Sequence, residues 1–180
     1  MDENKVLWNK CVEFHGHSCG GLTIGYKAAL YATQLLGLEF GGGGNAGCLS
    51  ADEEVVCIAE NDACGCDAIQ VILGCSIGKG NLLFHMCGKQ AFTFFNRKNG
   101  LSARIVLKPR PEGMTKEQSL AYYQNMSPED MFTVTPVKIA LPIQAKLFDS
   151  YPCECCGEST GANWIRIMNG KKICLDCYAA

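Results

Sequence analysis

The sequence has little of several features that would point to particular classes of protein. Among 180 residues it has three histidines and two tryptophans, and its formal net charge is −2. A charge so near zero creates no broad positive field to attract nucleic acid or an anionic membrane surface. The most apolar run, residues 68–77, is interrupted by Gln70 and is too short to cross a bilayer. These absences argue against nucleic-acid-binding and membrane-spanning proteins.

A secretory signal is also missing, because the charged start at residues 1–5 is followed by no long apolar run. What the chain has in excess is cysteine: 13 residues, an odd number that excludes complete disulfide pairing. Without an export signal, cysteines at this density are expected to be reduced thiols, metal ligands or redox-active groups. We therefore expect a cytoplasmic protein with no membrane attachment.

The pattern of apolar residues predicts an α+β or α/β core domain over residues 1–148. The expected helices cover residues 4–14, 22–36, 67–73 (with Asp67 as N-cap) and 115–125. The expected strands cover residues 55–59, 82–87, 91–96, 102–108 and 136–141. The first strand is apolar on both faces and should be buried, whereas the second and third are interpreted as a hairpin closed near Gly88. The glycines at 41–44 predict a loop.

The composition changes near residues 149–152, which predicts a small second domain over residues 149–180. Two Cys-x2-Cys pairs lie there, separated by seventeen residues, and this spacing is typical of a structural zinc site. The four predicted zinc ligands are Cys153, Cys156, Cys174 and Cys177. Gly157 follows the first pair and permits the left-handed backbone that a tight metal-binding turn needs.

The residues between the two pairs indicate what kind of zinc site this is. Residues 164–168 and 171–173 are strand-like, Asn169-Gly170 is a hairpin turn signal, and Cys174 opens a short helix. A cysteine turn, a hairpin and a helix in this order predict a treble-clef zinc finger, whose folding metal binding should drive. Cys155 is interpreted as a spare thiol, and an iron–sulfur site or disulfides remain alternatives.

A second group of candidate ligands lies near the N-terminus. His15-x-His17-x-Cys19 immediately precedes a predicted helix, whose positive end favours the thiolate form of Cys19. Cys64 lies in a turn between a buried strand and a helix, where α/β folds place reactive groups. These residues are candidate metal ligands or nucleophiles.

Residues 74–81 form a glycine-rich turn that departs from the P-loop pattern, because only three residues separate Gly74 from Gly78. It still presents one cation, Lys79, as a candidate contact for an anionic ligand. The remaining cysteines in apolar patterns are interpreted as small core residues: Cys11, Cys48, Cys57 and Cys87.

Five motifs follow one another in the first two thirds of the chain: residues 14–19, 60–64, 67–70, 74–82 and 88–94. Together they resemble the FmdE family of formylmethanofuran dehydrogenase proteins. The resemblance implies a thioredoxin-like α+β core, with a mixed sheet flanked by helices. Some members of the family also carry a C-terminal zinc finger, as expected here for residues 153–177.

The resemblance also implies a function. The family is associated with the molybdenum or tungsten enzyme that reduces CO₂ onto methanofuran in methanogenesis. It therefore implies an accessory or subunit-like role in one-carbon metabolism, alongside partner subunits of such an oxidoreductase. It further implies a Cys/His metal or active site in the core, which falls by motif on His17, Cys19 and Cys64, with His15 as a further candidate.

Two positions depart from the family pattern. Gly20 stands where proline is usual, and residues 85–87 lack an aspartate that is common there.

Other functions and an assembly remain open. A thiol redox protein would use Cys19 with Cys64 or Cys66, although Cys64-x-Cys66 is one residue shorter than the thioredoxin spacing. The finger can alternatively be a binding module for a protein partner, since the basic patch around Lys171 and Lys172 is too small to favour nucleic acid. The apolar strands lead us to expect a homodimer.

Overall fold

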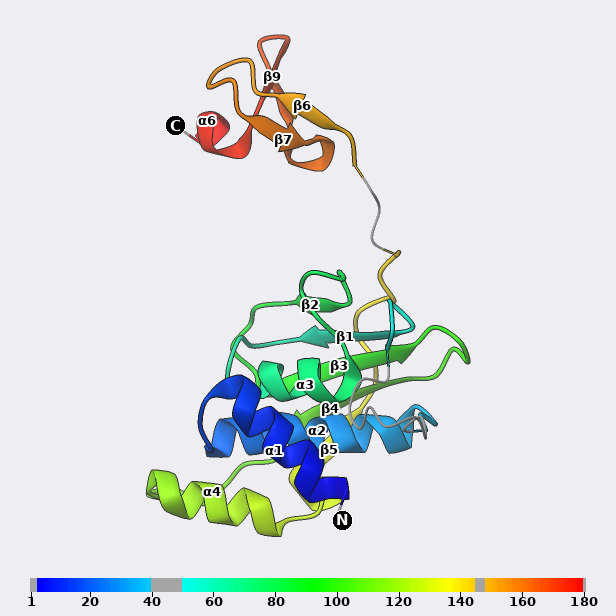
Figure 1. Cartoon of the computed structure of the whole chain (residues 1–180), viewed down its shortest axis with the longest axis vertical. Coiled ribbons are helices and arrows are strands. Elements are labelled where there is room, and N and C mark those ends of the chain that lie inside the picture. The colour runs from blue at the N-terminus through cyan, green and yellow to red at the C-terminus, as the bar shows by residue number, and fades with distance from the viewer. Residues whose placement is uncertain (1–2, 40–49, 145–147, 180) are drawn as a thin grey trace. The chain divides into compact units, whose positions relative to one another are not determined.

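The computed structural model describes residues 3–39, 50–144 and 148–179 (Figure 1). In it the chain divides into two compact units, Met1–Gln144 and Ala145–Ala180. The predicted glycine loop at residues 41–44 and Cys48 lie outside the described residues. Within the described ranges, no helix has the length and apolar character needed to span a bilayer.

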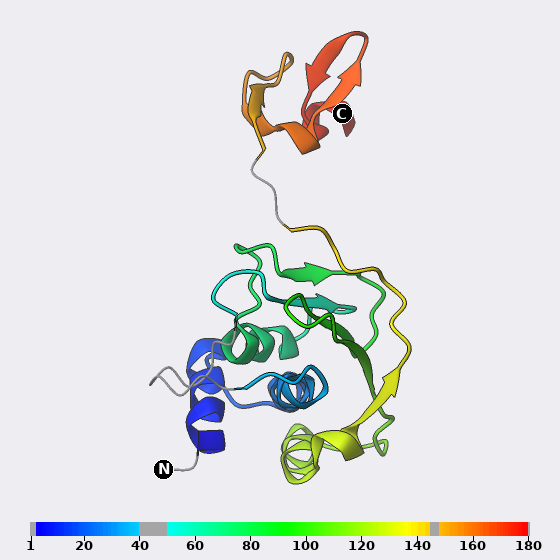
Figure 2. The same ribbon diagram turned by 90° about the vertical axis from the view of Figure 1, so that its right-hand side faces the viewer.

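The first unit is a mixed five-stranded sheet with helices packed against it (Figure 2). Its strands are β1 (Val55–Ala59), β2 (Leu82–Phe84), β3 (Ala91–Asn96), β4 (Ser102–Leu107) and β5 (Phe132–Thr135). They lie in the order β2-β1-β3-β4-β5, with β1 and β2 parallel and every other neighbouring pair antiparallel. The predicted mixed sheet flanked by helices is therefore confirmed.

Five helices belong to this unit, as far as its described residues show. They are α1 (Glu3–His15), α2 (Gly20–Leu35), α3 (Gly65–Leu73), α4 (Lys116–Asn125) and α5 (Pro128–Met131). The main core forms where α1, α2 and α3 meet the sheet, and its largest fully buried side chains include Leu22, Ile69, Phe92 and Phe94. Burying each of these stabilises the fold by about 1.5–3 kcal/mol.

Strand β1 is buried along its whole length, as its sequence predicts. Cys57 faces the helical core, whereas Val56 and Ile58 face the opposite side of the sheet. On that side they are covered partly by Val137 and Ile139, which come from an extended segment after β5. The strand predicted at residues 136–141 is therefore wrong. The nearby strand ends at Thr135, one residue before a proline that has no N–H for a ladder hydrogen bond.

The predicted hairpin of residues 82–87 and 91–96 is also wrong. Strand β2 pairs in parallel with β1, Cys57 opposite Leu82, and β1 lies between β2 and β3. The chain after β2 crosses the end of β1, where the backbone N–H groups of Cys87 and Lys89 donate to the carbonyl oxygen of Glu60. The doubly apolar β1 takes the interior position because only there are both of its faces buried.

Three of the cysteines interpreted as core residues lie in the described part of the chain, and two of these three are buried. Cys11 and Cys57 have no exposed surface, and burial raises the pKa of the Cys11 thiol to about 12. Cys87 is exposed instead, and its Sγ lies 3.4 Å from a carboxylate oxygen of Glu60. The apolar pattern around Cys87 failed as a guide because this residue follows the short strand β2 rather than lying within a strand.

The second unit consists of two small hairpins and a helix. Its elements are β6 (Ser150–Pro152), β7 (Ser159–Gly161), η1 (Ala162–Trp164), β8 (Arg166–Met168), β9 (Lys171–Ile173) and α6 (Leu175–Ala179). Asn169 and Gly170 both have positive φ, at 52° and 78°, as expected for the two-residue turn between β8 and β9. The predicted strand at residues 164–168 begins two residues later, after the 3-10 turn.

Candidate metal and thiol sites

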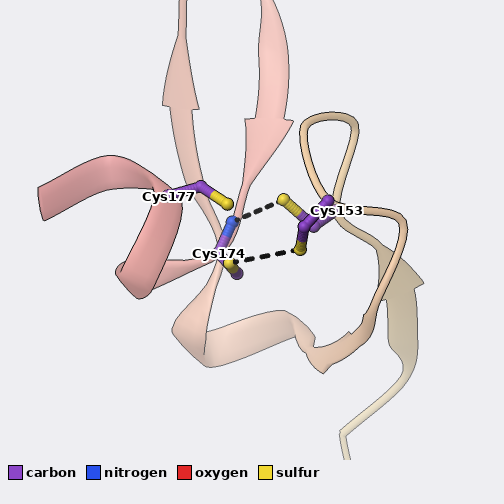
Figure 3. A group of neighbouring side chains, drawn as sticks. Cys153, Cys174 and Cys177 are labelled. Atoms are coloured by element: carbon purple, nitrogen blue, oxygen red, sulfur yellow. Dashed lines mark hydrogen bonds between the residues drawn. The ribbon is translucent and has the colours of Figure 1, made fainter. Parts of the chain in front are cut away.

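Four cysteines of the second unit converge on one point (Figure 3). Their sulfur atoms all lie within 4.8 Å of one another, and they belong to Cys153, Cys156, Cys174 and Cys177. The first pair sits on the turn after β6, which closes through a hydrogen bond from the Gly157 N–H to the Cys153 carbonyl oxygen and a φ of 79° at Gly157. The second pair flanks the start of α6. The structure therefore brings together the four cysteines that the sequence singled out.

Backbone N–H groups near this cluster favour the thiolate form of Cys153. The N–H groups of Cys174 and Cys155 donate to Cys153 Sγ at 3.3 and 3.4 Å, the first being drawn in Figure 3. These backbone donors, that of Cys174 above all, lower the pKa of Cys153 to about 6. A thiolate is the form that binds metal, and four sulfurs at this spacing match the donor set of a closed tetrahedral site. The cluster can therefore hold a metal ion.

The core site begins where α1 ends and α2 starts. Cys19 is the N-cap of α2, and its Sγ accepts a hydrogen bond from the Leu22 N–H at 3.3 Å. His15, the last residue of α1, places Nε2 3.8 Å from the same sulfur. His17 lies beside it, with the two imidazole rings 4.5 Å apart. Donor atoms of His15, His17 and Cys19 all lie within 4.8 Å of one another, so they too can hold a metal ion.

Asp67 orients His15 from a different element. Its carboxylate oxygen Oδ2 lies 2.7 Å from His15 Nδ1, leaving Nε2 directed at Cys19. A carboxylate on the far nitrogen is the usual support for a metal-bound or catalytic imidazole. Sequence reasoning assigned Asp67 to capping α3, but the N-cap of that helix is Cys64. Asp67 lies in its first turn and bonds to the imidazole instead.

Cys64 joins this group through the crossing of α2 and α3. A Cβ on Gly21 would lie 3.5 Å from the Cys64 sulfur and 3.9 Å from the Cys19 sulfur, so the two thiols are neighbours. Burial, together with the neighbouring Cys19, raises the pKa of the Cys64 thiol. The crossing depends on glycine: a Cβ on Gly25 would overlap the backbone of Gly65, and one on Gly21 would lie 3.2 Å from the Cys64 Cβ. Small residues at the contact let the two helix starts approach, which brings Cys19 and Cys64 together.

An open pocket of about 570 Å³ lies over these residues. His17, Cys19 and Cys64 line it, and so do residues 110 and 114–117 at the start of α4 and the loop before it. The N-caps of three helices, Cys19, Cys64 and Thr115, therefore all border one cavity. A small molecule entering this pocket would meet both thiols and one imidazole.

Two other predicted residues lie elsewhere. Lys79 does not line the pocket, and its ammonium donates to the Ser50 carbonyl oxygen at 2.7 Å. Cys66 is buried, which raises its pKa to about 11, and its Sγ lies 3.5 Å from the Asn61 carbonyl oxygen. Sequence reasoning missed Arg110 and Lys116 at the pocket wall. Neither belongs to a motif, and only the packing of α4 beside α2 brings them there.

The chain matches the family model described as "FmdE, Molybdenum formylmethanofuran dehydrogenase operon" over residues 14–133. The chain belongs to the FmdE family. The FmdE match includes His15, His17, Cys19 and Cys64 and ends before the cysteine-rich tail. The resemblance seen in the sequence motifs is thereby confirmed.

A solved structure has the same fold. The crystal structure of a tungsten formylmethanofuran dehydrogenase FmdE-like protein from Syntrophus aciditrophicus has a TM-score of 0.66, covering 97% of this chain and 91% of that one at 21% identity. It shows the fold.

A curated relative from Archaeoglobus fulgidus, named "Probable S-adenosyl-L-methionine-binding protein", is 26% identical over 92% of this chain. This FmdE chain spans about half the length of that relative.

Proposed function

We propose that this FmdE-family chain is a zinc protein with a reactive metal site in its core and a structural zinc finger in its tail. The core ion would be held by Cys19 and His17 with His15 or Cys64, and the tail ion by the four cysteines of the second unit. The observation that carries the core site is the Asp67–His15–Cys19 chain of contacts, 2.7 and 3.8 Å long, which ends at a sulfur that lines an open pocket.

The two donor sets suit different tasks. Four thiolates fill a tetrahedral zinc site completely, as structural sites do. A mixed imidazole and thiolate set beside a cavity leaves a position open, as catalytic sites do, and zinc bound there would supply an activated water or polarise a carbonyl. Around it, Asp67 holds the His15 ring in place, and the Leu22 N–H at the start of α2 donates a hydrogen bond to Cys19 Sγ.

The biological setting follows from the family. We propose a cytoplasmic accessory or subunit-like role in one-carbon metabolism, alongside a molybdenum or tungsten enzyme, with the chain itself a homodimer. The FmdE match supports the link to that enzyme's operon. Sedimentation of the purified chain would report a homodimer. Co-purification with the enzyme's other chains, from an organism that has both, would test the partnership.

Metal analysis of two single variants tests the two sites separately. The wild type should bind two zinc ions per chain, and Cys19→Ala and Cys177→Ala should each bind one. Anomalous scattering at the zinc edge would then show one position in each unit. If Cys19→Ala keeps both ions, or if the wild type binds only the tail ion, the core metal site is wrong.

A second function is favoured by one observation, the nearness of Cys19 to Cys64, whose sulfur atoms would lie 3.9 and 3.5 Å from a Cβ on Gly21. A pair of thiols this close can exchange with a disulfide substrate: the two thiols lose two electrons and two protons and become joined, while the substrate is reduced to two thiols. Mass mapping in glutathione buffers of defined potential would test this. A reversible Cys19–Cys64 bond in metal-free protein would favour it over the metal site, and Cys66 should take no part.

A further inference from the structure

The segment that forms the second wall of the pocket carries two basic side chains, Arg110 and Lys116. In the part of the chain that the structure describes, neither forms an ion pair. The one acidic side chain of the lining is Glu117, and the pKa of its carboxyl is lowered by its own backbone N–H, by the Thr115 side chain and by the neighbouring Lys116. The charged side chains of the wall therefore leave one positive charge in excess.

The position of this wall is set by a glycine. A Cβ at position 20 would lie 2.9 Å from Ser119 Oγ, so the absence of a side chain there lets α4 pack against the start of α2. This packing holds Arg110 and Lys116 at the same cavity as Cys19. The rest of that wall includes Met114 and Leu120, which offer apolar surface to the body of a ligand.

We propose that the pocket binds a small organic carboxylate, whose carboxylate group contacts Arg110 and Lys116 while another part of the molecule reaches Cys19. The inference rests on the proposed function, because it names the substrate class of that site. The planar guanidinium can grip a carboxylate with two parallel hydrogen bonds. One excess positive charge matches a monoanion better than a phosphate dianion, and a cavity of about 570 Å³ suits a small molecule.

Two alkylating reagents of nearly equal size test this directly. Iodoacetate carries a carboxylate and iodoacetamide a neutral amide; in both, the cysteine sulfur forms a bond to the CH₂ carbon and iodide leaves. Reduced full-length protein is treated with an equimolar mixture, with and without a chelator, and each cysteine is mapped by mass. Exposed Cys155, in the other unit, serves as the internal reference.

We expect Cys19 to favour iodoacetate over iodoacetamide, relative to Cys155, by on the order of fivefold to tenfold at low salt. The double variant Arg110→Gln/Lys116→Gln should lose this preference, and Glu117→Gln should increase it. Lys138→Gln removes one positive charge from an exposed position outside the pocket and should change nothing. Lys79→Gln should also leave the ratio unchanged.

Three results would overturn the inference: a Cys19 ratio equal to that of Cys155, a preference that survives in the double variant, or no alkylation of Cys19 with or without chelator. Adding inorganic phosphate or acetate as a competitor distinguishes the anion classes, since acetate should protect Cys19 more strongly at equal ionic strength. Zinc content measured on the same samples reports separately on the proposed function. If the protein binds no zinc in its core but Cys19 still prefers iodoacetate, the carboxylate site is supported and the core metal site is wrong.

Discussion

The variant Gly25→Ala tests whether the close crossing of α2 and α3 brings the sulfur atoms of Cys19 and Cys64 near each other. The added Cβ would overlap the carbonyl oxygen, Cα and carbonyl carbon of Gly65. All three are backbone atoms, so no change of side-chain rotamer can relieve the overlap. The helices must separate by roughly 1–1.5 Å to restore ordinary contact distances.

Helix propensity and overpacking predict opposite changes in the unfolding free energy of Gly25→Ala. Helix propensity alone predicts that alanine in place of an interior helical glycine stabilises the protein by about 1 kcal/mol. Overpacking a well-packed contact costs about 1–3 kcal/mol, and more when backbone must move. Because the clash here is with backbone, we expect the overlap to prevail and Gly25→Ala to lose about 2 kcal/mol of unfolding free energy.

Urea unfolding followed by circular dichroism measures this loss, and the rate of Cys19–Cys64 bond formation under a mild oxidant measures the separation of the sulfurs. Gly78→Ala is the matched control, because a Cβ there meets nothing within 4 Å and Gly78 does not have a positive φ. It should unfold at the same urea concentration as the wild type. If Gly25→Ala is as stable as the wild type and forms the bond equally fast, the account of the crossing is refuted.

Two further predictions concern charge and metal. Glu60 and Arg104 form a buried pair, with Nε–Oε1 at 2.6 Å and both side chains 5% exposed, and Arg104 lowers the pKa of Glu60 from 4.5. Glu60→Gln should lower the free energy of unfolding by about 3–5 kcal/mol at pH 7. Because the lowered pKa means that folding favours the ionised carboxylate, this advantage of the wild type should shrink as the pH falls below about 4.5. Urea titrations of both proteins over this pH range would measure it. Cys177→Ala or a chelator should unfold residues 149–180 while the core keeps its unfolding transition, as hydrogen exchange would report; loss of both units together would contradict separate folding.

The tail shows how much spacing alone can predict. Cysteines separated by two residues in a tight turn can aim both sulfurs at one ion, and Cys174 and Cys177 lie about one helical turn apart. Asn169-Gly170 adopts the positive φ values that its turn needs. The hydrogen bond that joins the two pairs, from the Cys174 N–H to Cys153 Sγ, spans 21 positions. The spacing within each pair and between the pairs is nevertheless that of a four-cysteine metal site, so the order of residues predicts the four converging sulfurs.

The core shows where such prediction stops. The helices and the buried strand β1 follow from periodicity and from caps such as Thr115, which opens α4 and forms a capping box with Gln118. The pairing of β2 with β1 instead of β3 could not be read from the sequence, because strand order depends on which strand gains most from burial on both faces.

What the sequence by itself determined is the chemistry: cysteines and histidines in spacings that metal ions accept, on elements whose type the local pattern dictates. What only the tertiary structure decided is which of them meet. Asp67 reaches His15 across 52 positions of sequence, and Cys64 reaches Cys19 because Gly21, Gly25 and Gly65 let two helices cross closely. Contacts of this kind depend on backbone packing between distant segments, and no local pattern records them.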